Sequence, residues 1–268
     1  MRIVSFLRLD IHTKGAYIRL LSTIKRDSKM KLLDTNGGNT KLRKNNRDKA
    51  IRVAGLSLKP NDLLCPMRKT AECELPCLEA AGRGGMSNVS EGRQRKTDFY
   101  MQDRSGFLEM LYDELHNFQK LCERNNVEPY VRLNVLSDIQ YELEANGAIP
   151  QNFPKLNLFD YTKIAKRLDR VPDNYSLMFS YSNAERYRPQ VEIALNTDRP
   201  ISAVFHGGMP KSFLGRPVVN GDNSDIINLQ QRGKIVGLKY KPPRGRQIDP
   251  LHSSFVIDAN RIPAFFMG

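Results

Sequence analysis

The sequence lacks tryptophan, holds only four cysteines and contains no long uninterrupted apolar run. A membrane-spanning helix needs about 18 consecutive apolar residues, so the sequence predicts a soluble protein. Three cysteines, Cys65, Cys73 and Cys77, fall within 13 residues, which is too crowded for a disulfide framework in a secreted domain of 268 residues. With 40% hydrophobic and 26% charged residues, the composition excludes a wholly disordered chain.

Several catalytic signatures are also missing. The sequence has no P-loop, no glycine-rich dinucleotide fingerprint after a strand, no H-E-x-x-H and no G-x-S-x-G. These absences argue against P-loop nucleotide hydrolysis, Rossmann-type dinucleotide chemistry, zinc-dependent proteolysis of the H-E-x-x-H type and serine hydrolysis.

Positive charge is concentrated at the start of the chain. Residues 1–52 contain 14 Lys and Arg against four Asp, and so carry +10 of the formal net charge of +13. A basic arm attracts nucleic acid through counterion release, although a solvated leader has the same composition. We therefore predict a basic N-terminal extension over residues 1–30, either disordered or a mis-called start, followed by a single domain over residues 31–268.

From residue 53 onward, short β-type runs alternate with helical stretches, which predicts a parallel sheet with helical crossovers. The clearest helix has Ser105 as its N-cap, and its apolar face includes Cys122, predicted to be a core thiol. Further helices are expected at residues 162–168 and 185–195. The seven predicted strands cover residues 53–58, 130–136, 156–161, 175–180, 201–205, 234–238 and 255–257.

This number of strands in one α/β domain favours a complete or partial (β/α) barrel, with a doubly wound open sheet as the alternative. In a barrel the carboxyl ends of the strands converge on one face, where functional groups gather. Polar side chains follow most predicted strands, so we expect a site for a polar, anionic or nucleobase-like ligand there; solvated turns are the alternative explanation. The predicted catalytic residues are Asp138, Glu142, Asp160 and Lys163, and the predicted substrate-binding residues are Arg132, Asn134, Ser180, Ser182, Asp222 and Lys239.

Cys65, Cys73 and Cys77 form a C-x7-C-x3-C loop after the first predicted strand. Three thiolates on one loop can hold zinc with a fourth ligand such as His206 or His252. They can equally hold three irons of an iron–sulfur cluster whose fourth iron is open to a substrate or to S-adenosylmethionine. The position resembles that of the cysteines in radical S-adenosylmethionine enzymes, although their usual spacing is C-x3-C-x2-C. Three reduced cysteines packed as small hydrophobic residues are the remaining alternative.

Five segments follow one another in a specific order: Asn36–Leu42, Cys65–Gly84, Arg132–Ile139, Phe159–Lys163 and Ile235–Lys239. Together they resemble an uncharacterised family of bacteriophage proteins related to the gene-product-88 domain, over about residues 31–241. The resemblance implies a phage or prophage origin, and hence the cytoplasm of an infected host cell. It also implies a barrel-like α/β fold and a cysteine cluster as a family feature, but no established reaction.

Three functions are consistent with these features. The first is a metal- or iron-sulfur-dependent enzyme of radical type that acts on a nucleotide- or nucleobase-like substrate. The second is nucleobase exchange on DNA or RNA, similar to guanine transglycosylases, with Asp138 or Asp160 as nucleophile and a structural zinc; the usual zinc loop of those enzymes is absent. The third is a non-enzymatic accessory protein that binds nucleic acid or a host factor through the basic arm and through Arg93, Arg95 and Lys96, a group that a solvated helix face also explains. No membrane partner is expected.

Overall fold

The computed structural model describes residues 30–35, 40–46, 48–243, 245 and 249–262. The chain divides into two units, Met1–Met30 and Lys31–Gly268, and the helices and strands of the described residues lie in the second. The predicted basic extension lies outside the described residues, apart from Met30. No helix in the described ranges is both long and apolar enough to cross a membrane.

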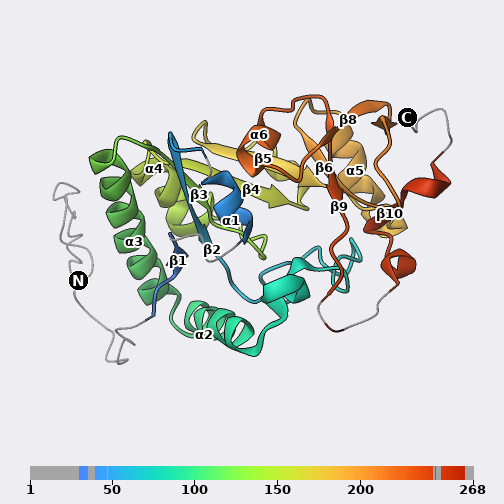
Figure 1. The fold of residues 1–268 in the computed structure, drawn as a ribbon. Helices are drawn as coiled ribbons and strands as arrows, with labels where there is room; N and C mark the ends of the chain where they lie inside the picture. The colour runs from blue at the N-terminus through green and yellow to red at the C-terminus, as the bar shows by residue number, and fades with distance from the viewer. Residues whose placement is uncertain (1–29, 36–39, 47, 244, 246–248, 263–268) are drawn as a thin grey trace, which may run out of the picture. The chain divides into compact units, whose positions relative to one another are not determined.

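A mixed sheet of ten strands, counted over the described residues, forms the centre of the second unit (Figure 1). The spatial order is β1-β2-β3-β4-β5-β6-β9-β8-β7, and β10 pairs with the end of β6. Neighbours from β2 to β8 along this order are parallel, whereas β1 and β7 are antiparallel to β2 and β8. The strands are β1 Leu33–Asp34, β2 Ile51–Leu56, β3 Glu128–Arg132, β4 Asn157–Thr162, β5 Tyr175–Ser180, β6 Ile201–His206, β7 Ser212–Phe213, β8 Arg216–Asn220, β9 Ile235–Lys239 and β10 Val256–Asp258.

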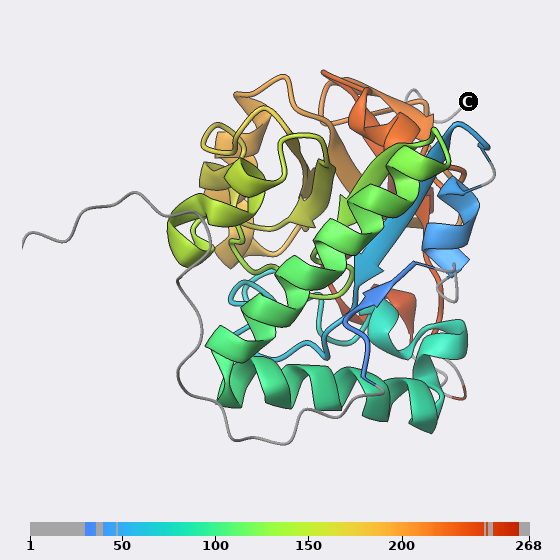
Figure 2. The ribbon, with the colours of Figure 1, turned by 90° about the vertical axis from the view of Figure 1, so that its left-hand side faces the viewer.

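The helices lie in the connections between the strands. The two long ones, α2 and α3, both connect β2 to β3, and Figure 2 shows α3 running diagonally across the sheet. The predicted helix over residues 185–195 forms as a 3-10 turn followed by α5. The α-helices are α1 Thr40–Asn45, α2 Ser87–Gln102, α3 Arg104–Arg124, α4 Ala148–Asn152, α5 Arg188–Leu195 and α6 Asp225–Leu229.

The sheet is open, so the predicted complete or partial (β/α) barrel is wrong. A closed barrel needs its last strand to pair with its first. Here the outer edge of β2 is already occupied by β1, through the pairs Leu33↔Leu56 and Asp34↔Gly55. The other end of the order is the β7–β8 hairpin. The sheet also differs from a doubly wound one, because β2 to β6 follow chain order without a reversal at the centre.

The seven predicted strands are all present, with ends displaced by at most four residues. The predicted helix at residues 162–168 is wrong, because only a 3-10 turn, Ala165–Arg167, forms there. The backbone N–H of Ala165 donates to the Gln190 side chain at 2.8 Å, and the Arg167 side chain turns into the interior. These tertiary contacts replace the hydrogen bonds that a longer helix would make.

Helix α3 has the predicted apolar face, but it begins two residues earlier than expected. Its N-cap is Asp103, not Ser105, and the Asp103 carboxylate accepts from the Gly106 N–H at 2.8 Å. The helix ends at Arg124, with Asn125 as its C-cap. Cys122 is fully buried, which confirms that it is a core thiol. The buried residues of the helix are Gly106, Phe107, Leu111, Leu115, Phe118 and Cys122.

Successive strand residues point to opposite faces of the sheet and enter two separate cores. Ala54 and Leu158 belong to the large core with α3, whereas Val53 and Phe159 pack with Leu42 of α1 and Ile226 of α6 in a small core. The second face is therefore covered by α1 and α6 only at one end. The remainder of that face, toward the carboxyl ends of the strands, is available for a site.

The α3 core contact leads to a stability prediction. Leu115 is fully buried and Leu108 only partly, although both lie on the apolar face. Leu115→Ala should lower the free energy of unfolding by about 2–5 kcal/mol, because it leaves a cavity in the large core. Leu108→Ala, the matched control, should cost clearly less in the same urea titration. Equal losses would contradict this placement of α3.

Candidate active site

A cavity of about 150 Å³ lies at the carboxyl ends of the parallel strands. Its walls come from the ends of β3, β4, β5, β6 and β9 and from residues 57–86, which connect β2 to α2 and are called the cysteine loop below. Phe255, just before β10, also contributes. The predicted convergence of functional groups at the strand ends therefore occurs on an open sheet, without barrel closure.

Short turns build the first part of the cysteine loop. The Asn61 side chain accepts from the N–H groups of Leu63 and Leu64 at 2.9 Å, which starts the turn before Cys65. The Cys73 N–H donates to the Arg68 carbonyl at 3.0 Å, and the Arg68 N–H to the Cys65 carbonyl at 3.0 Å. Cys65 and Cys73 are thus connected through the backbone of Arg68.

The end of the cysteine loop is held by glycine and by α2. Nη1 of Arg93 donates to the carbonyl oxygens of Glu79 and Gly84, at 3.0 and 3.2 Å. A Cβ atom on Gly84 would lie 2.6 Å from the Glu79 oxygen, so only glycine fits this turn. These contacts place the segment after Cys77 against the first turns of α2.

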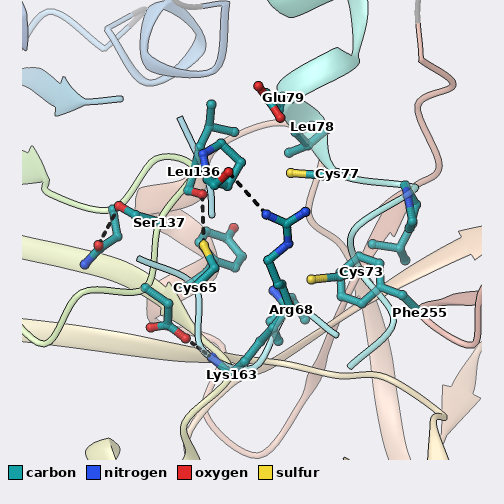
Figure 3. Close-up of a pocket in the computed structure, with 18 of the residues that line it drawn as sticks. Cys65, Arg68, Cys73, Cys77, Leu78, Glu79, Leu136, Ser137, Lys163 and Phe255 are labelled. Carbon is teal, nitrogen blue, oxygen red and sulfur yellow. Dashed lines mark hydrogen bonds between the residues drawn. The ribbon is translucent and has the colours of Figure 1, made fainter. Parts of the chain in front are cut away.

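The three loop cysteines line the same cavity together with Lys163. Figure 3 shows their sulfur atoms directed toward the Arg68 side chain from three sides. The Cys65 thiol also donates to the Leu136 carbonyl at 3.3 Å. Lys163 follows β4, and its Nζ lies 5.0 Å from the centre of the Phe255 ring. The sequence prediction that these cysteines and Lys163 share a site is consistent with this placement.

Burial disfavours the charged form of the thiols. It raises the pKa of Cys65 to about 12 and raises the pKa of Cys77 as well. Burial also opposes the charge of Lys163, but Cys73, Asp138 and the other two thiols raise the pKa of its ammonium. At neutral pH the structure therefore holds a charged Lys163 beside the protonated thiols of Cys65 and Cys77.

Three thiols on one loop commonly hold either a zinc ion or an iron–sulfur cluster. Within the described ranges, no three His, Cys, Asp or Glu side chains converge closely enough to bind a single metal ion. The arrangement therefore does not fit zinc, and neither His206 nor His252, both exposed, completes a set. An iron–sulfur cluster is larger than one ion, so its thiolate ligands surround a volume. Three thiols that line one cavity without meeting at a point fit that group by number and kind.

Arg68 occupies the space toward which the thiols point. Its Nη1 donates to the Pro60 carbonyl at 3.3 Å, and the guanidinium also pairs with Glu74 and Asp62, which are both exposed. Any group bound by all three cysteines would require this side chain to move. Asp62 and Glu74 at the rim provide partners for the displaced guanidinium.

A buried ion network lies behind the cavity and contains two predicted catalytic residues. Nη1 of Arg167 donates to Asp138 at 2.5 Å, while its Nε and Nη2 donate to the two oxygens of Glu142 at 2.7 and 2.8 Å. The other Asp138 oxygen accepts from the Lys163 backbone N–H at 2.8 Å. Asp138 lines the cavity and Glu142 does not. Both carboxylates are therefore occupied by hydrogen bonds that hold Arg167 in place, and Asp138 also holds the backbone of Lys163.

Asp160 lies deeper, with no exposed surface. Its oxygens accept from the backbone and side chain of Asn134, at 2.6 and 2.9 Å, and from the Tyr175 hydroxyl at 2.5 Å. Burial raises the pKa of Asp160 to about 6 despite these donors. The carboxylate holds the ends of β3 and β4 together and is outside the cavity wall.

The predicted substrate-binding residues divide into two groups. Arg132, Asn134, Ser180 and Lys239 line the cavity. Ser182 is buried outside it, where its hydroxyl accepts from the Ala184 N–H at 3.2 Å. Asp222 also lies outside, and it accepts from the Lys239 backbone and the Lys241 ammonium. The sequence predictions gave no site role to several other residues that line the cavity: Arg68, Tyr161, Ser202, Tyr240, Lys241 and Phe255.

The predicted nucleic-acid-binding group on α2 is mostly committed to the fold. Arg93 holds the end of the cysteine loop, and the Lys96 ammonium donates to the Leu32 carbonyl at 2.8 Å. Arg95 alone of the three is exposed.

A second cavity shares Lys239 and Tyr240 with the first. It is lined by His206 and by Gly207 and Gly208 at the end of β6, and the His206 ring meets the Tyr240 ring edge to face at 6.2 Å. The hydroxyl of Tyr240 is buried and has no hydrogen-bond partner among the described residues.

The site therefore defines a protein with an open α/β sheet and a cavity lined by three cysteines at its strand ends. The model of one family, described as Gene product 88, matches residues 30–250. The chain belongs to this family and is a phage gene-product-88-related protein, as its motifs predicted. The match covers the cysteine loop and the strand ends that form the cavity. Neither the search of curated proteins nor the search of solved structures found a match to this chain.

Thiol reactivity tests the description of the cysteine loop. With a pKa of about 12 instead of 9.0, the thiolate fraction of Cys65 at pH 8 is roughly 1000-fold lower than that of an ordinary thiol. In metal-free folded protein, Cys65 and Cys77 should therefore react with iodoacetamide far more slowly than in the urea-unfolded chain, as measured by mass spectrometry. Equal rates in the two states would show that these thiols are not buried.

Loss of the buried arginine should destabilise the site as a whole. Arg167→Met leaves Asp138 and Glu142 buried without their cation, which should cost about 3–5 kcal/mol of unfolding free energy. Arg170→Met, an exposed neighbour, is the control and should change little. Urea unfolding of both variants provides the comparison, and a stable Arg167→Met protein would argue that the network contributes no net stabilisation.

Proposed function

We propose that this chain is an iron–sulfur enzyme of radical type, with Cys65, Cys73 and Cys77 as the cluster ligands. The observation that supports the proposal is that all three thiols of one loop line a single cavity beside Lys163, at the carboxyl ends of parallel strands. A cluster with one iron free of protein ligands supplies one-electron chemistry on a bound substrate or on S-adenosylmethionine.

The chain's own residues would prepare the loop for this role. Lys163 supplies a positive charge next to the sulfurs, which favours their thiolate form. Asp138 holds the backbone of Lys163, and Arg167 holds Asp138, so the ammonium is positioned by a rigid network. Arg68 would leave the space among the thiols, while its partners Asp62 and Glu74 retain it at the rim.

The substrate would be small and polar at the end that enters the cavity. A volume of about 150 Å³ admits a single small group, not a whole polymer segment. Arg132, Ser180 and Ser202 provide hydrogen-bonding groups on the wall formed by the strands. These features agree with a nucleotide- or nucleobase-like substrate, of which one part is inside the cavity and the rest outside.

The geometry favours nucleobase exchange less. That reaction needs a strand-end carboxylate free to attack the substrate. Both oxygens of Asp138 accept hydrogen bonds within the protein, and those of Asp160 are buried and bonded as well. Binding of nucleic acid through α2 is also less favoured, since Arg93 and Lys96 donate to backbone carbonyls.

Metal analysis of protein prepared without oxygen tests the proposal. The wild-type chain should contain about four irons with matching acid-labile sulfide and be coloured. Cys65→Ser, Cys73→Ser and Cys77→Ser should each lose most of the iron and colour, because each removes one of three ligands. Cys122→Ser is the matched control: it should keep the iron and lose only about 1–3 kcal/mol of stability.

Colourless wild-type protein without iron, even after reconstitution with iron and sulfide, would contradict the proposal. So would equal iron content in all four variants. Stoichiometric zinc in place of iron would instead support the structural-zinc alternative.

A further inference from the structure

The side chain of Arg132 is held on one side only. Arg132 ends β3, is 3% exposed and lines the cavity. Its guanidinium lies over the Tyr161 ring, 4.5 Å from the ring centre, and its Nη1 donates to Asp225 of α6 at 3.0 Å. These two contacts orient the guanidinium plane rigidly.

The other edge of the guanidinium has no partner among the residues that the structure describes. Nε is buried without an acceptor, and no described residue accepts from Nη2. A buried donor without a partner is costly, more so when it is charged, and so an unpaired guanidinium edge in a cavity wall indicates a missing acceptor. Nε and Nη2 point in the same direction and bind two oxygens of one carboxylate or phosphate at once.

The rest of the cavity wall has more positive than negative side chains. Five cationic side chains line the cavity against three carboxylates, although Arg132 and Lys241 each also pair with a carboxylate outside the wall. Of the carboxylates, Asp138 is bound to Arg167 and Glu74 to Arg68. The ammonium groups of Lys163 and Lys239 form no hydrogen bond or ion pair with any described residue, and the hydroxyl of Ser180 adds a donor. The cavity is therefore complementary to an anion.

We infer that this cavity binds the carboxylate or phosphate group of a small ligand, held by the Nε and Nη2 edge of Arg132. Asp225 and Tyr161 are positioning residues that keep the edge turned to the ligand. The inference adds a ligand class to the proposed function and rests on that function only for the reaction. Anion binding itself needs no cluster.

Two simple probes test the inference: inorganic phosphate and acetate, each titrated at constant ionic strength with chloride as the balancing ion. Calorimetry should show saturable binding of at least one probe to the wild-type chain. Arg132→Lys should weaken it by about tenfold, because a lysine keeps the charge and loses the two-donor edge. Arg132→Gln should abolish it, whereas Arg95→Gln, an exposed control on α2, should bind like the wild type.

Preference for phosphate would indicate a phosphorylated ligand, and preference for acetate a carboxylic acid. No binding of either probe, or equal binding by Arg132→Gln, would overturn the inference. Loss of the Asp225 ion pair destabilises Arg132→Gln, so a second measurement uses only the wild-type chain. Crystals soaked in selenate should show an anomalous peak within hydrogen-bond distance of Arg132 Nε; a peak elsewhere, or none, also overturns it.

Cys77→Ser separates this inference from the proposed function. The variant should lose iron and still show saturable binding of the anion. Iron-free wild-type protein that still binds phosphate at Arg132 would leave the anion site standing while the cluster proposal fails. An iron-containing protein without anion binding would give the opposite result.

Discussion

The buried Arg167 guanidinium, with Asp138 and Glu142 bound to it, is the interaction on which the site depends. It comes from a short turn after β4, but its partners lie in the segment after β3, so it joins the ends of two neighbouring strands. Asp138 in turn accepts a hydrogen bond from the Lys163 backbone and so fixes its position. Asp160 of β4 makes a second connection between the same strand ends, because it accepts from Asn134 after β3. Desolvating so many charges is tolerated only because each one is paired.

The excess of positive charge in the cavity wall connects the two proposals. The cavity holds more cations than carboxylates, while burial keeps the Cys65 and Cys77 thiols protonated. Negative charge can enter this cavity in two ways, as thiolates stabilised by a cluster or as an anionic ligand on Arg132. The two are at different parts of the wall: the thiols are on the cysteine loop and Arg132 is on β3. Both changes would lower the same excess of positive charge.

Much of the fold was predictable because local sequence sets it. Apolar, β-branched runs marked all seven predicted strands, and the 3.6-residue periodicity marked the buried face of α3. The open edge of the sheet was not predictable, since the two-residue strand β1, which blocks the edge of β2, carries almost no pattern. Helix α2 was not predicted either: only Thr97 and Tyr100 of its 16 residues are buried, so it has no clear apolar stripe.

The sequence by itself determined which residue types occur together: three cysteines on one loop, and polar residues after successive strands. The tertiary structure decided what each of them faces. Asp138 and Lys163 were both candidates at strand ends, yet the first is bound to Arg167 while the ammonium of the second is directed into the cavity. Asp225 of α6, over 90 residues after Arg132, binds only Nη1 of the guanidinium. Nε is therefore left without a partner among the described residues. Pairing of charges depends on distances across the fold, and those are set by sheet order and packing rather than by spacing along the chain.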